Sequence, residues 1–272
     1  MPAPGLPEPL ARLQRAVTRR VFNPAYPASD AEVEADLARM QGAPAALRRP
    51  VLVLGGYRSP RASPAMLVRS LAALTSRRAE DFEVVSYFAA ATVREALASV
   101  HRAVARRGWA GDLDVVAISM GGLVARAAAA NPPIPGSWYP PGCGPARPAG
   151  HAGPPLRIAR LFTLATPHRG ALLATVTAPD PAAEDMEPGS MFLRTLDAAL
   201  PSAEYELTCY TRLGDYWVGS AGTSPPGRGV IWTPPIWIGN HFAVQTCPRI
   251  LADLARRLRG EHPLAQPSAL PD

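Results

Sequence analysis

The stretch DVVAISMGGLVARAAAA, residues 114–130, decides the fold of this chain. Its first five residues are typical of a buried strand, and the small apolar residues that end it are typical of a helix. Between them stands Ala117-Ile118-Ser119-Met120-Gly121, which has the small-x-Ser-x-Gly pattern of a nucleophile elbow. A serine on so sharp a turn needs small neighbours two positions away, and the free N–H groups of the following helix favour an anion. The stretch therefore predicts a reactive serine at Ser119.

Expected strands and helices alternate on both sides of this stretch. Capping patterns at Ser29–Glu32 and Thr92–Glu95, together with Ser63-Pro64, mark helix starts. Apolar runs predict strands at residues 51–54, 82–87, 114–118, 158–164, 205–210 and 230–232. Such alternation predicts the α/β class, with a mostly parallel sheet covered by helices on both faces.

The domain organisation follows from length and composition. The chain has 272 residues, 47% of them hydrophobic, which suits one large α/β domain, expected over residues 51–260. Residues 1–50 are expected to form a helical accessory segment, and residues 261–272 a C-terminal tail. Two stretches, the Pro/Gly-rich excursion 131–155 and residues 177–188, are expected to be loops, either plain insertions or the rim of a site.

The charge of the chain does not point to nucleic acid. The formal net charge is +6 and the pI about 9.7. The sequence contains arginine but no lysine. The arginines are scattered, many in pairs near expected helix ends, where they complement the helix dipole. A nucleic-acid surface would need a concentrated basic stripe with interleaved aromatic residues. We therefore expect no nucleic-acid partner.

The sequence also indicates where the protein is located and whether its cysteines are reduced. No apolar run reaches the roughly 18 residues of a membrane span, and the first twenty residues hold no apolar signal-peptide core. A cytoplasmic protein is therefore expected. Cys143, Cys209 and Cys247 are far apart and form no CxxC pair, which predicts reduced, mostly structural thiols and no metal site.

A serine nucleophile needs a histidine as base and an acid that orients the histidine. In hydrolases of this type the chain order is serine, acid, histidine. His241, in Gly239-Asn240-His241-Phe242, leads toward the final helix and is the expected base. Four other histidines compete with it. His101 precedes the serine, and His151 lies in the proline-rich excursion. His168 directly follows an expected strand, and His262 lies in the C-terminal tail.

Asp215, which follows the expected strand 205–210, is the expected acid. An alternative stays open, because some hydrolases place the acid after the preceding strand, where this chain has Asp180, Glu184 and Asp185. Asp197 is expected on a helix and is a weaker candidate. A second serine, Ser220, is rejected because bulky Val218 stands two positions before it and no helix follows.

The oxyanion of the reaction intermediate needs two backbone N–H donors. One is expected from Met120, directly after the nucleophile. The other is expected from the turn after the first strand, Gly55-Gly56-Tyr57, and by position we assign it to the N–H of Tyr57.

Four stretches together resemble the lipase-like branch of the α/β-hydrolase superfamily, close to bacterial triacylglycerol lipases and GPI-inositol-deacylase-like hydrolases. They are VLVLGGYRS, VVAISMGGLVAR, LFTLATPHRG, and LGDYWV with GNHF, and they occur in the family's order between residues 50 and 258. The resemblance implies the α/β-hydrolase fold, an acid loop at Asp215, a catalytic His241, and a structural role outside the triad for His168. The family usually has His-Gly where this chain has Gly55-Gly56.

These observations predict an esterase or lipase-like serine hydrolase that forms an acyl-enzyme, without a metal or an organic cofactor. The expected substrate is a small apolar ester, and transient contact with a lipid surface is compatible with it. The alternatives are a thioesterase or amidase with the same triad, and a non-catalytic binding module of the same fold. A dinucleotide-binding protein is disfavoured, because the Gly55-Gly56 turn lacks the third spaced glycine.

Overall fold

A computed structural model describes residues 21–131, 154–171 and 180–271 of the chain. These residues are organised around a six-stranded sheet in the order β2-β1-β3-β4-β5-β6, in which every neighbouring pair of strands is parallel. The strands are β1 (Val51–Leu54), β2 (Phe82–Val85), β3 (Leu113–Ile118), β4 (Ile158–Leu164), β5 (Glu206–Arg212) and β6 (Ile231–Thr233). The expected parallel sheet is confirmed, and its strand ends differ by at most two residues from the expected ones.

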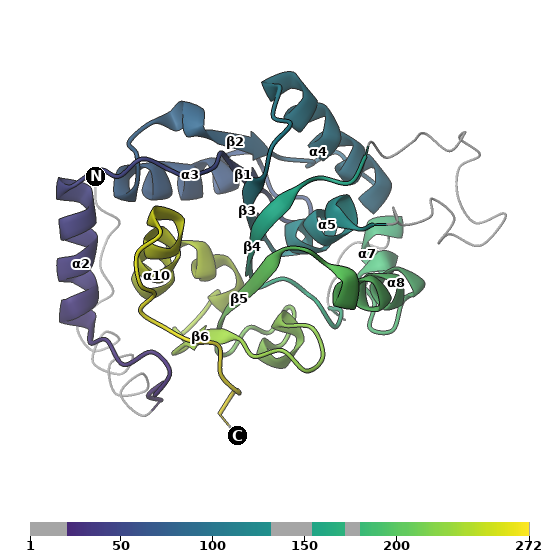
Figure 1. Ribbon diagram of the computed structural model, residues 1–272. Coiled ribbons are helices and arrows are strands. Elements are labelled where there is room, and N and C mark those ends of the chain that lie inside the picture. Colours follow the sequence, from purple (N-terminus) through teal and green to yellow (C-terminus); the bar gives the residue numbers. More distant parts are fainter. Residues whose placement is uncertain (1–20, 132–153, 172–179, 272) are drawn as a thin grey trace, which may run out of the picture.

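Helices cover both faces of the sheet (Figure 1). One face carries α2 (Asp30–Gly42), α3 (Ala62–Leu74) and α10 (Pro248–Arg259), and the other carries α4 (Val93–Arg107), α5 (Met120–Ala129), α7 (Pro181–Asp185) and α8 (Met191–Ala199). Each face has its own apolar core. Strand β3 is buried along its whole length, and its side chains alternate: Val115 and Ala117 enter one core, Val116 and Ile118 the other. The strand before the serine is therefore held from both sides.

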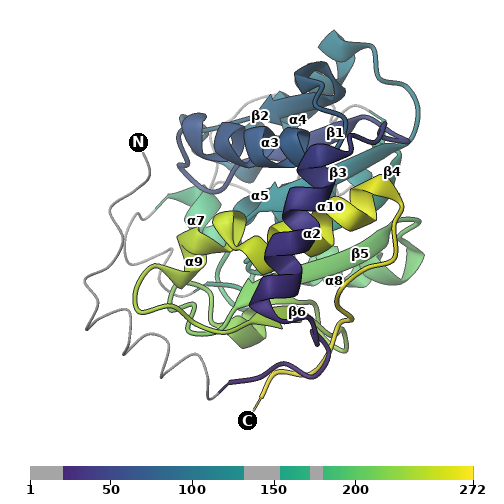
Figure 2. The ribbon, with the colours of Figure 1, turned by 90° about the vertical axis from the view of Figure 1, so that its left-hand side faces the viewer.

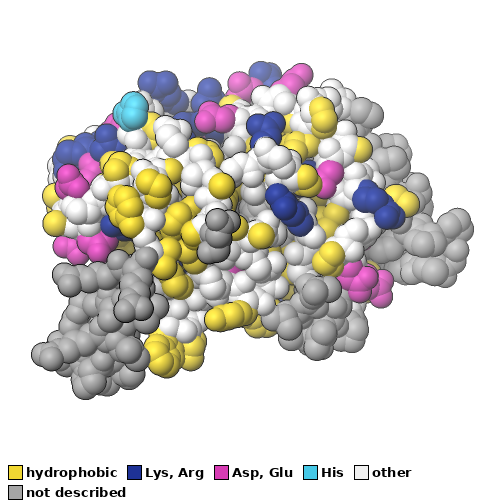
Figure 3. Space-filling view, turned by 90° about the horizontal axis from the view of Figure 1, so that it is seen from below, with side chains coloured by type: hydrophobic (Ala, Val, Ile, Leu, Met, Phe, Trp, Pro, Cys, Tyr) yellow, Lys and Arg dark blue, Asp and Glu magenta, His cyan; other side chains and the backbone are white. Residues whose placement is uncertain are grey.

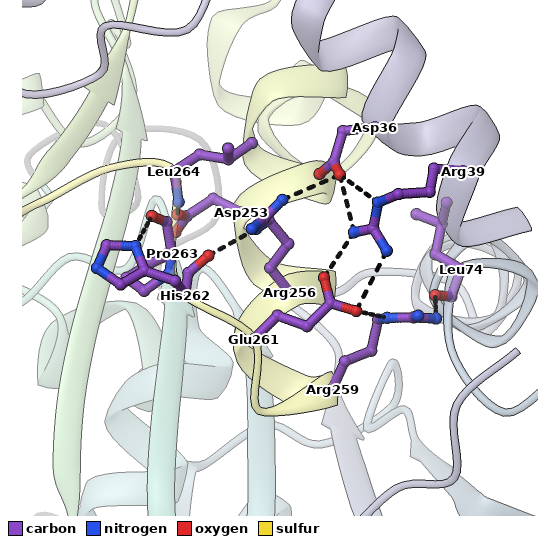
Figure 4. A network of polar contacts seen from close by, with 10 residues as sticks. All are labelled: Asp36, Arg39, Leu74, Asp253, Arg256, Arg259, Glu261, His262, Pro263 and Leu264. Atoms are coloured by element: carbon purple, nitrogen blue, oxygen red, sulfur yellow. Dashed lines mark hydrogen bonds and ion pairs between the residues drawn. The ribbon is translucent and has the colours of Figure 1, made fainter. Parts of the chain in front are cut away.

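Helix α2 packs across α10 at the surface of the molecule (Figure 2). A network of charged side chains joins the two helices and the residues that follow α10 (Figure 4). Asp36 accepts hydrogen bonds from Arg39 and Arg256, and Glu261 accepts from Arg39 and Arg259. The capping box at Ser29 and Glu32, expected from the sequence, begins α2. Residues on both sides of the expected domain limits thus pack against the main body.

The C-terminal segment also joins the body. A backbone bridge links Val230 to Ser268, and Ala265 is buried. Asp253 of α10 is fully buried and accepts hydrogen bonds from the backbone N–H groups of Leu264 and Ala265. Because a buried carboxylate is stable only when its oxygens are satisfied, these contacts hold the segment against α10.

Two local expectations were wrong. Helix α3 begins at Ala62 with Arg61 at the N-cap position and no side-chain cap; Ser63 lies inside the helix, and its hydroxyl pairs with the amide of Gln245. The stretch 177–188 is not loop throughout, since α7 lies within it. Asp180 caps α7 by accepting from the N–H of Ala183, and Pro181 occupies the first turn, where its missing N–H costs nothing.

Some sequence expectations fall on residues 1–20, 132–153 and 172–179, which lie outside the described residues. They include His151, Cys143 and nearly all of the Pro/Gly-rich excursion. Cys209 and Cys247 are buried free thiols. In the three described ranges, no helix is long and apolar enough to cross a membrane.

Candidate active site

Ser119 occupies a strained turn between β3 and α5. Its backbone has φ 51° and ψ −126°, in the positive-φ range that residues other than glycine rarely adopt. Three hydrogen bonds hold this conformation. The Ser119 N–H donates to the carbonyl of Leu164 (2.8 Å), and the Ser119 carbonyl accepts from the Thr166 hydroxyl (2.8 Å) and the Gly122 N–H (3.0 Å). The turn is the strand–serine–helix elbow that the sequence predicted.

Close packing explains the glycine two residues after the serine. A Cβ on Gly121 would lie 2.6 Å from the carbonyl oxygen of Gly55 and 3.1 Å from the Cβ of Leu54. Ala117, two residues before the serine, is completely buried. Since no larger side chain fits at Gly121, the elbow can pack against β1 only with glycine at this position.

His241 lies in the short helix α9 (Asn240–Ala243) and faces the serine. Its Nε2 is 3.1 Å from Ser119 Oγ, and its Nδ1 is 2.8 Å from Asp215 Oδ2. Asn240 fixes the approach of the two loops, because its Nδ2 donates to the carbonyl of Gly214 and its Oδ1 accepts from the N–H of Ile236. The sequence order did not reveal this contribution of Asn240, although it stands directly before the expected base.

Asp215 follows β5 and is only 3% exposed. Its Oδ1 accepts hydrogen bonds from the backbone N–H groups of Trp217 (2.9 Å) and Val218 (3.1 Å), which leaves Oδ2 directed at His241. Backbone donors on one oxygen hold the carboxylate rigid, as an orienting acid requires. The structure therefore brings Ser119, His241 and Asp215 into one hydrogen-bonded chain at the carboxyl edge of the parallel sheet.

The two elements expected to supply the oxyanion donors lie next to the serine. Met120 is the first residue of α5, so its backbone N–H has no partner within the helix. On the other side lies the glycine turn, residues 55–58, whose Gly56 is so close that a Cβ there would lie 3.2 Å from the Cβ of Ser119. Tyr57 follows Gly56 in this turn. The elements needed for an oxyanion hole are thus adjacent to the serine.

The three competing histidines that the structure describes make no hydrogen bond to Ser119. His168 is fully buried behind the elbow, with Nδ1 3.1 Å from Arg126 Nη1 and Nε2 3.1 Å from Thr163 Oγ1. Burial, reinforced by the nearby Arg126 and Arg169, holds the pKa of His168 well below its ordinary value. His101 lies on α4, and burial lowers its pKa as well. His262 is exposed beyond α10, where its ring contacts the carbonyl of Pro263.

The competing acids and the second serine have other partners. Asp180 binds Tyr57 and Arg58, and Asp197 of α8 forms an ion pair with Arg126 (2.9 Å). Asp185 is buried in α7. Ser220 begins a 3₁₀ turn and donates to the carbonyl of Arg212. None of these contacts involves Ser119 or His241.

Apolar side chains surround the histidine at the surface. The ring of Phe242 lies edge-on to that of His241 with centroids 5.3 Å apart, and Trp217 is 6.3 Å away. Trp217 is 39% exposed and Phe242 59%. Tyr216, Trp237 and Ile238, on the same two loops, are exposed as well. Seen from below, near β6, hydrophobic side chains gather on the molecular surface (Figure 3).

The described residues contain no group of three or more His, Cys, Asp or Glu side chains that could hold a metal ion. In the hydrogen-bonded chain of Ser119, His241 and Asp215, the imidazole lies where it can accept the serine proton and the carboxylate lies where it can orient the imidazole.

The chain as a whole was compared with known proteins. No family model and no curated protein matches the chain. Among solved structures, it is similar to the mature Bacillus licheniformis lipase BlEst2, with 11% identity over 75% of this chain and 89% of that one, at a TM-score of 0.46. It also matches the metagenomic carboxyl esterase MGS0156, with 15% identity, coverages of 79% and 76%, and a TM-score of 0.45. The third is the thioesterase RedJ of Streptomyces coelicolor, with 18% identity, coverages of 81% and 96%, and a TM-score of 0.45.

These three are a lipase, a carboxyl esterase and a thioesterase. The α/β fold class expected from the sequence, a mostly parallel sheet with helices on both faces, is confirmed. At these identities and scores the likeness to the three structures supports no conclusion about the chemistry.

Proposed function

We propose that this chain is a serine hydrolase that cleaves carboxylic esters through an acyl-enzyme, in the manner of an esterase or lipase. One observation carries the proposal: the unbroken chain of contacts from Ser119 Oγ to His241 Nε2 and from His241 Nδ1 to Asp215 Oδ2. Ser119 is the nucleophile, His241 the general base and acid, and Asp215 the group that orients and electrostatically supports the histidine.

In the first half of the reaction, Ser119 Oγ attacks the ester carbonyl carbon while His241 Nε2 takes the hydroxyl proton. The carbonyl electron pair moves onto oxygen, where the N–H groups of Met120 and Tyr57 stabilise the charge. Each such donor is worth about 3 kcal/mol in the transition state. Collapse of the intermediate breaks the bond to the alcohol, which leaves with the proton from His241, and the acyl group stays on Ser119.

In the second half, water replaces the alcohol. His241 takes a proton from the water as the water oxygen attacks the acyl carbon, and the same two N–H groups hold the new oxyanion. The bond to Ser119 Oγ then breaks, the serine recovers its proton from His241, and the carboxylic acid is released. The balanced reaction is ester plus water to acid plus alcohol.

An uncharged, apolar ester is the proposed substrate class. The rings of Trp217 and Phe242 stand beside His241 and are partly exposed, so they can cover an apolar acyl or alcohol group. Tyr216, Trp237 and Ile238 on the same loops are exposed as well. Transient contact with a lipid surface is therefore compatible with this substrate class. Nucleic acid is not part of the proposal, and neither is a metal or cofactor.

A series of p-nitrophenyl esters of increasing acyl length, with matched thioesters, tests the proposal. We expect turnover of short to medium apolar esters, and Ser119→Ala should lower the rate by about 10⁶-fold. Ser220→Ala is the matched control and should keep the wild-type rate. Undiminished hydrolysis by Ser119→Ala would contradict the proposal, and a strict preference for thioesters would assign the same triad to a thioesterase.

Chelation provides an independent test of the metal-free mechanism. Ester hydrolysis should be unchanged by EDTA, because every step proposed above uses only side chains and backbone groups of this chain. Loss of hydrolysis with EDTA and its return with calcium or zinc would contradict this part of the proposal.

A further inference from the structure

The carboxylate of Asp180 joins the glycine turn to the opposite side of the site. Its Oδ2 accepts a hydrogen bond from the Tyr57 hydroxyl (2.6 Å) and one from Arg58 Nη2 (2.8 Å). Its Oδ1 accepts the N–H of Ala183 and caps α7 (2.9 Å). One carboxylate therefore holds two consecutive side chains of the turn that carries the proposed oxyanion donor.

The Asp180 end of this contact is firmly anchored. Helix α7 is tied to the residues before α4 by the hydrogen bond from the Ala182 N–H to the Ala91 carbonyl, and Ala182 and Ala183 are fully buried in the core beneath the site. Burial alone would raise the pKa of Asp180. The hydrogen bonds from Tyr57, Arg58 and the Ala183 N–H outweigh that effect and hold the pKa below its ordinary value. Asp180 is thus an ionised acceptor at neutral pH.

The glycine turn is well anchored at its start. The Gly55 N–H donates to the carbonyl of Val85 (2.9 Å), and the Gly55 carbonyl accepts from the Tyr87 hydroxyl. At its other end, Arg58 adopts φ 48°, a left-handed conformation that costs an arginine energy unless neighbouring contacts enforce it. The Arg58 side chain ends on Asp180, so the ion pair opposes that cost. Burial, together with the bond to Asp180, raises the pKa of Tyr57 to about 12, so its hydroxyl remains a donor.

We propose that Asp180 is a positioning residue that holds the backbone of Tyr57 in place for the oxyanion. This inference rests on the proposed function. Oxyanion donors act only within a narrow range of about 2.7–3.1 Å from the developing charge. A turn that is free to shift by about 1 Å loses much of that stabilisation. The contacts of Asp180 supply the restraint from an element 123 residues away along the chain.

The same contacts explain why Asp180 is not the triad acid. Its Oδ2 is occupied by Tyr57 and Arg58 and its Oδ1 by the α7 backbone, whereas Oδ2 of Asp215 faces His241. Asp180, which the sequence left open as an alternative triad acid, therefore has the positioning role at the same site.

A double-mutant cycle tests the inference on the full chain. Tyr57→Phe removes one oxygen atom and keeps the ring. Asp180→Asn keeps the helix cap, because asparagine caps as well as aspartate. It presents a neutral amide, in place of the carboxylate, to Tyr57 and Arg58. Each variant should lower kcat for a p-nitrophenyl ester between about tenfold and 100-fold, less than the loss of an oxyanion donor outright. KM should stay within about twofold, since the restraint acts on the transition state.

The double variant should be no slower than the slower single variant, because both changes break one contact. The rate constant for fluorophosphonate labelling should fall in parallel with kcat. Asp112→Asn is the matched control: Asp112 pairs with Arg157 at 2.7 Å on the surface, before β3 begins, and its loss should leave kcat unchanged. Thermal unfolding confirms that each variant is folded. If Asp180→Asn does not fold, Tyr57→Phe alone provides the test.

The outcomes separate this inference from the proposed function. A wild-type chain that neither hydrolyses esters nor reacts with fluorophosphonate would refute the function itself. An active wild type whose Tyr57→Phe and Asp180→Asn variants keep its kcat would overturn only the positioning role. So would a change confined to KM, or losses that multiply in the double variant.

Discussion

His241 and His168 have surroundings that differ in charge. His241 is bounded by the Asp215 carboxylate on one ring nitrogen and by the Ser119 hydroxyl on the other. His168 has the Arg126 guanidinium at Nδ1 and the Thr163 hydroxyl at Nε2, and it is completely buried. An anion beside a histidine stabilises its protonated form, and a cation destabilises it.

This difference assigns the two rings different tasks. A base that takes the serine proton must carry a positive charge during the reaction, which Asp215 supports at His241 and Arg126 opposes at His168. The His168 ring instead joins Arg126 of α5, the helix that follows the serine, to Thr163 of β4. The residues next to it hold the turn directly, because the His168 N–H donates to the carbonyl of Thr166 and the Thr166 hydroxyl donates to the carbonyl of Ser119. Under the proposed function, His241 is the base of the reaction, and His168 supports the turn that carries Ser119.

The largest expected effect separates the two histidines by rate. His241→Gln should lower kcat for ester hydrolysis by about 10⁶-fold, because it removes the base whose Nε2 lies 3.1 Å from Ser119 Oγ. His168→Gln should lose far less, since the ring does not touch the serine. Steady-state kinetics on folded protein measure both. Equal losses in the two variants would erase the distinction.

The acid that supports His241 gives the next largest effect. Asp215→Asn should lower kcat by about 10⁴-fold, through the wrong tautomer and lost charge stabilisation of the histidine. Matched changes at Glu184 and Asp185 should leave kcat near that of the wild type, and Asp180→Asn should lose far less than Asp215→Asn. The assignment fails if changes on the earlier loop inactivate the enzyme while Asp215→Asn stays active.

How much of this could be predicted from the sequence depends on the range of the interaction. Ser119 was found because the elbow is local: a strand, a small-x-Ser-x-Gly turn and a helix lie within 17 residues. The chain-order rule then led to Asp215 and His241, which the structure places together. The rule could not supply the contact between Tyr57 and Asp180, because nothing in either local sequence refers to the other.

The two errors of the sequence analysis have different causes, one distant and one local. Ser63 looked like a helix cap, but its hydroxyl pairs with Gln245, 182 residues away. The helix α7 was missed although its signal was present: Asp180 before Pro181 is a cap followed by a proline in the first turn. The loose, polar appearance of the surrounding residues hid that pair.

For stability, the expected order of the two histidines is the reverse of their order for kcat. His168→Gln should lower the free energy of unfolding by about 1–3 kcal/mol, because the Arg126 guanidinium loses its buried partner. His241→Gln should cost less, since its ring is at the edge of the site and next to exposed side chains. Urea denaturation of both variants provides the measurement. A larger loss for His241→Gln would contradict the supporting role of His168.

The smallest effect concerns pH. His168 has a pKa well below 6.5 in the folded chain, through burial and the nearby Arg126, so the unfolded chain binds its proton first as the pH falls. Stability from the neutral ring is therefore complete above about pH 6.5 and declines below it, by at most about 1.4 kcal/mol per pH unit. The stability gap between wild type and His168→Gln should narrow from pH 7.5 to 5.5. A gap that widens would contradict the depressed pKa.

His101 requires a control in that experiment. Burial lowers its pKa as well, so it contributes to acid sensitivity in the same direction. The comparison should therefore be made within a His101→Gln background, in which only the His168 contribution remains to change.

The identity of the nucleophile is the central claim, and covalent labelling measures it most directly. The intact chain is treated with a fluorophosphonate, digested, and the modified residue is located by mass spectrometry. We predict a single phosphonylated site at Ser119, no labelling of Ser119→Ala, and labelling of Ser220→Ala equal to that of the wild type. A label on Ser220, or undiminished labelling of Ser119→Ala, would contradict the account.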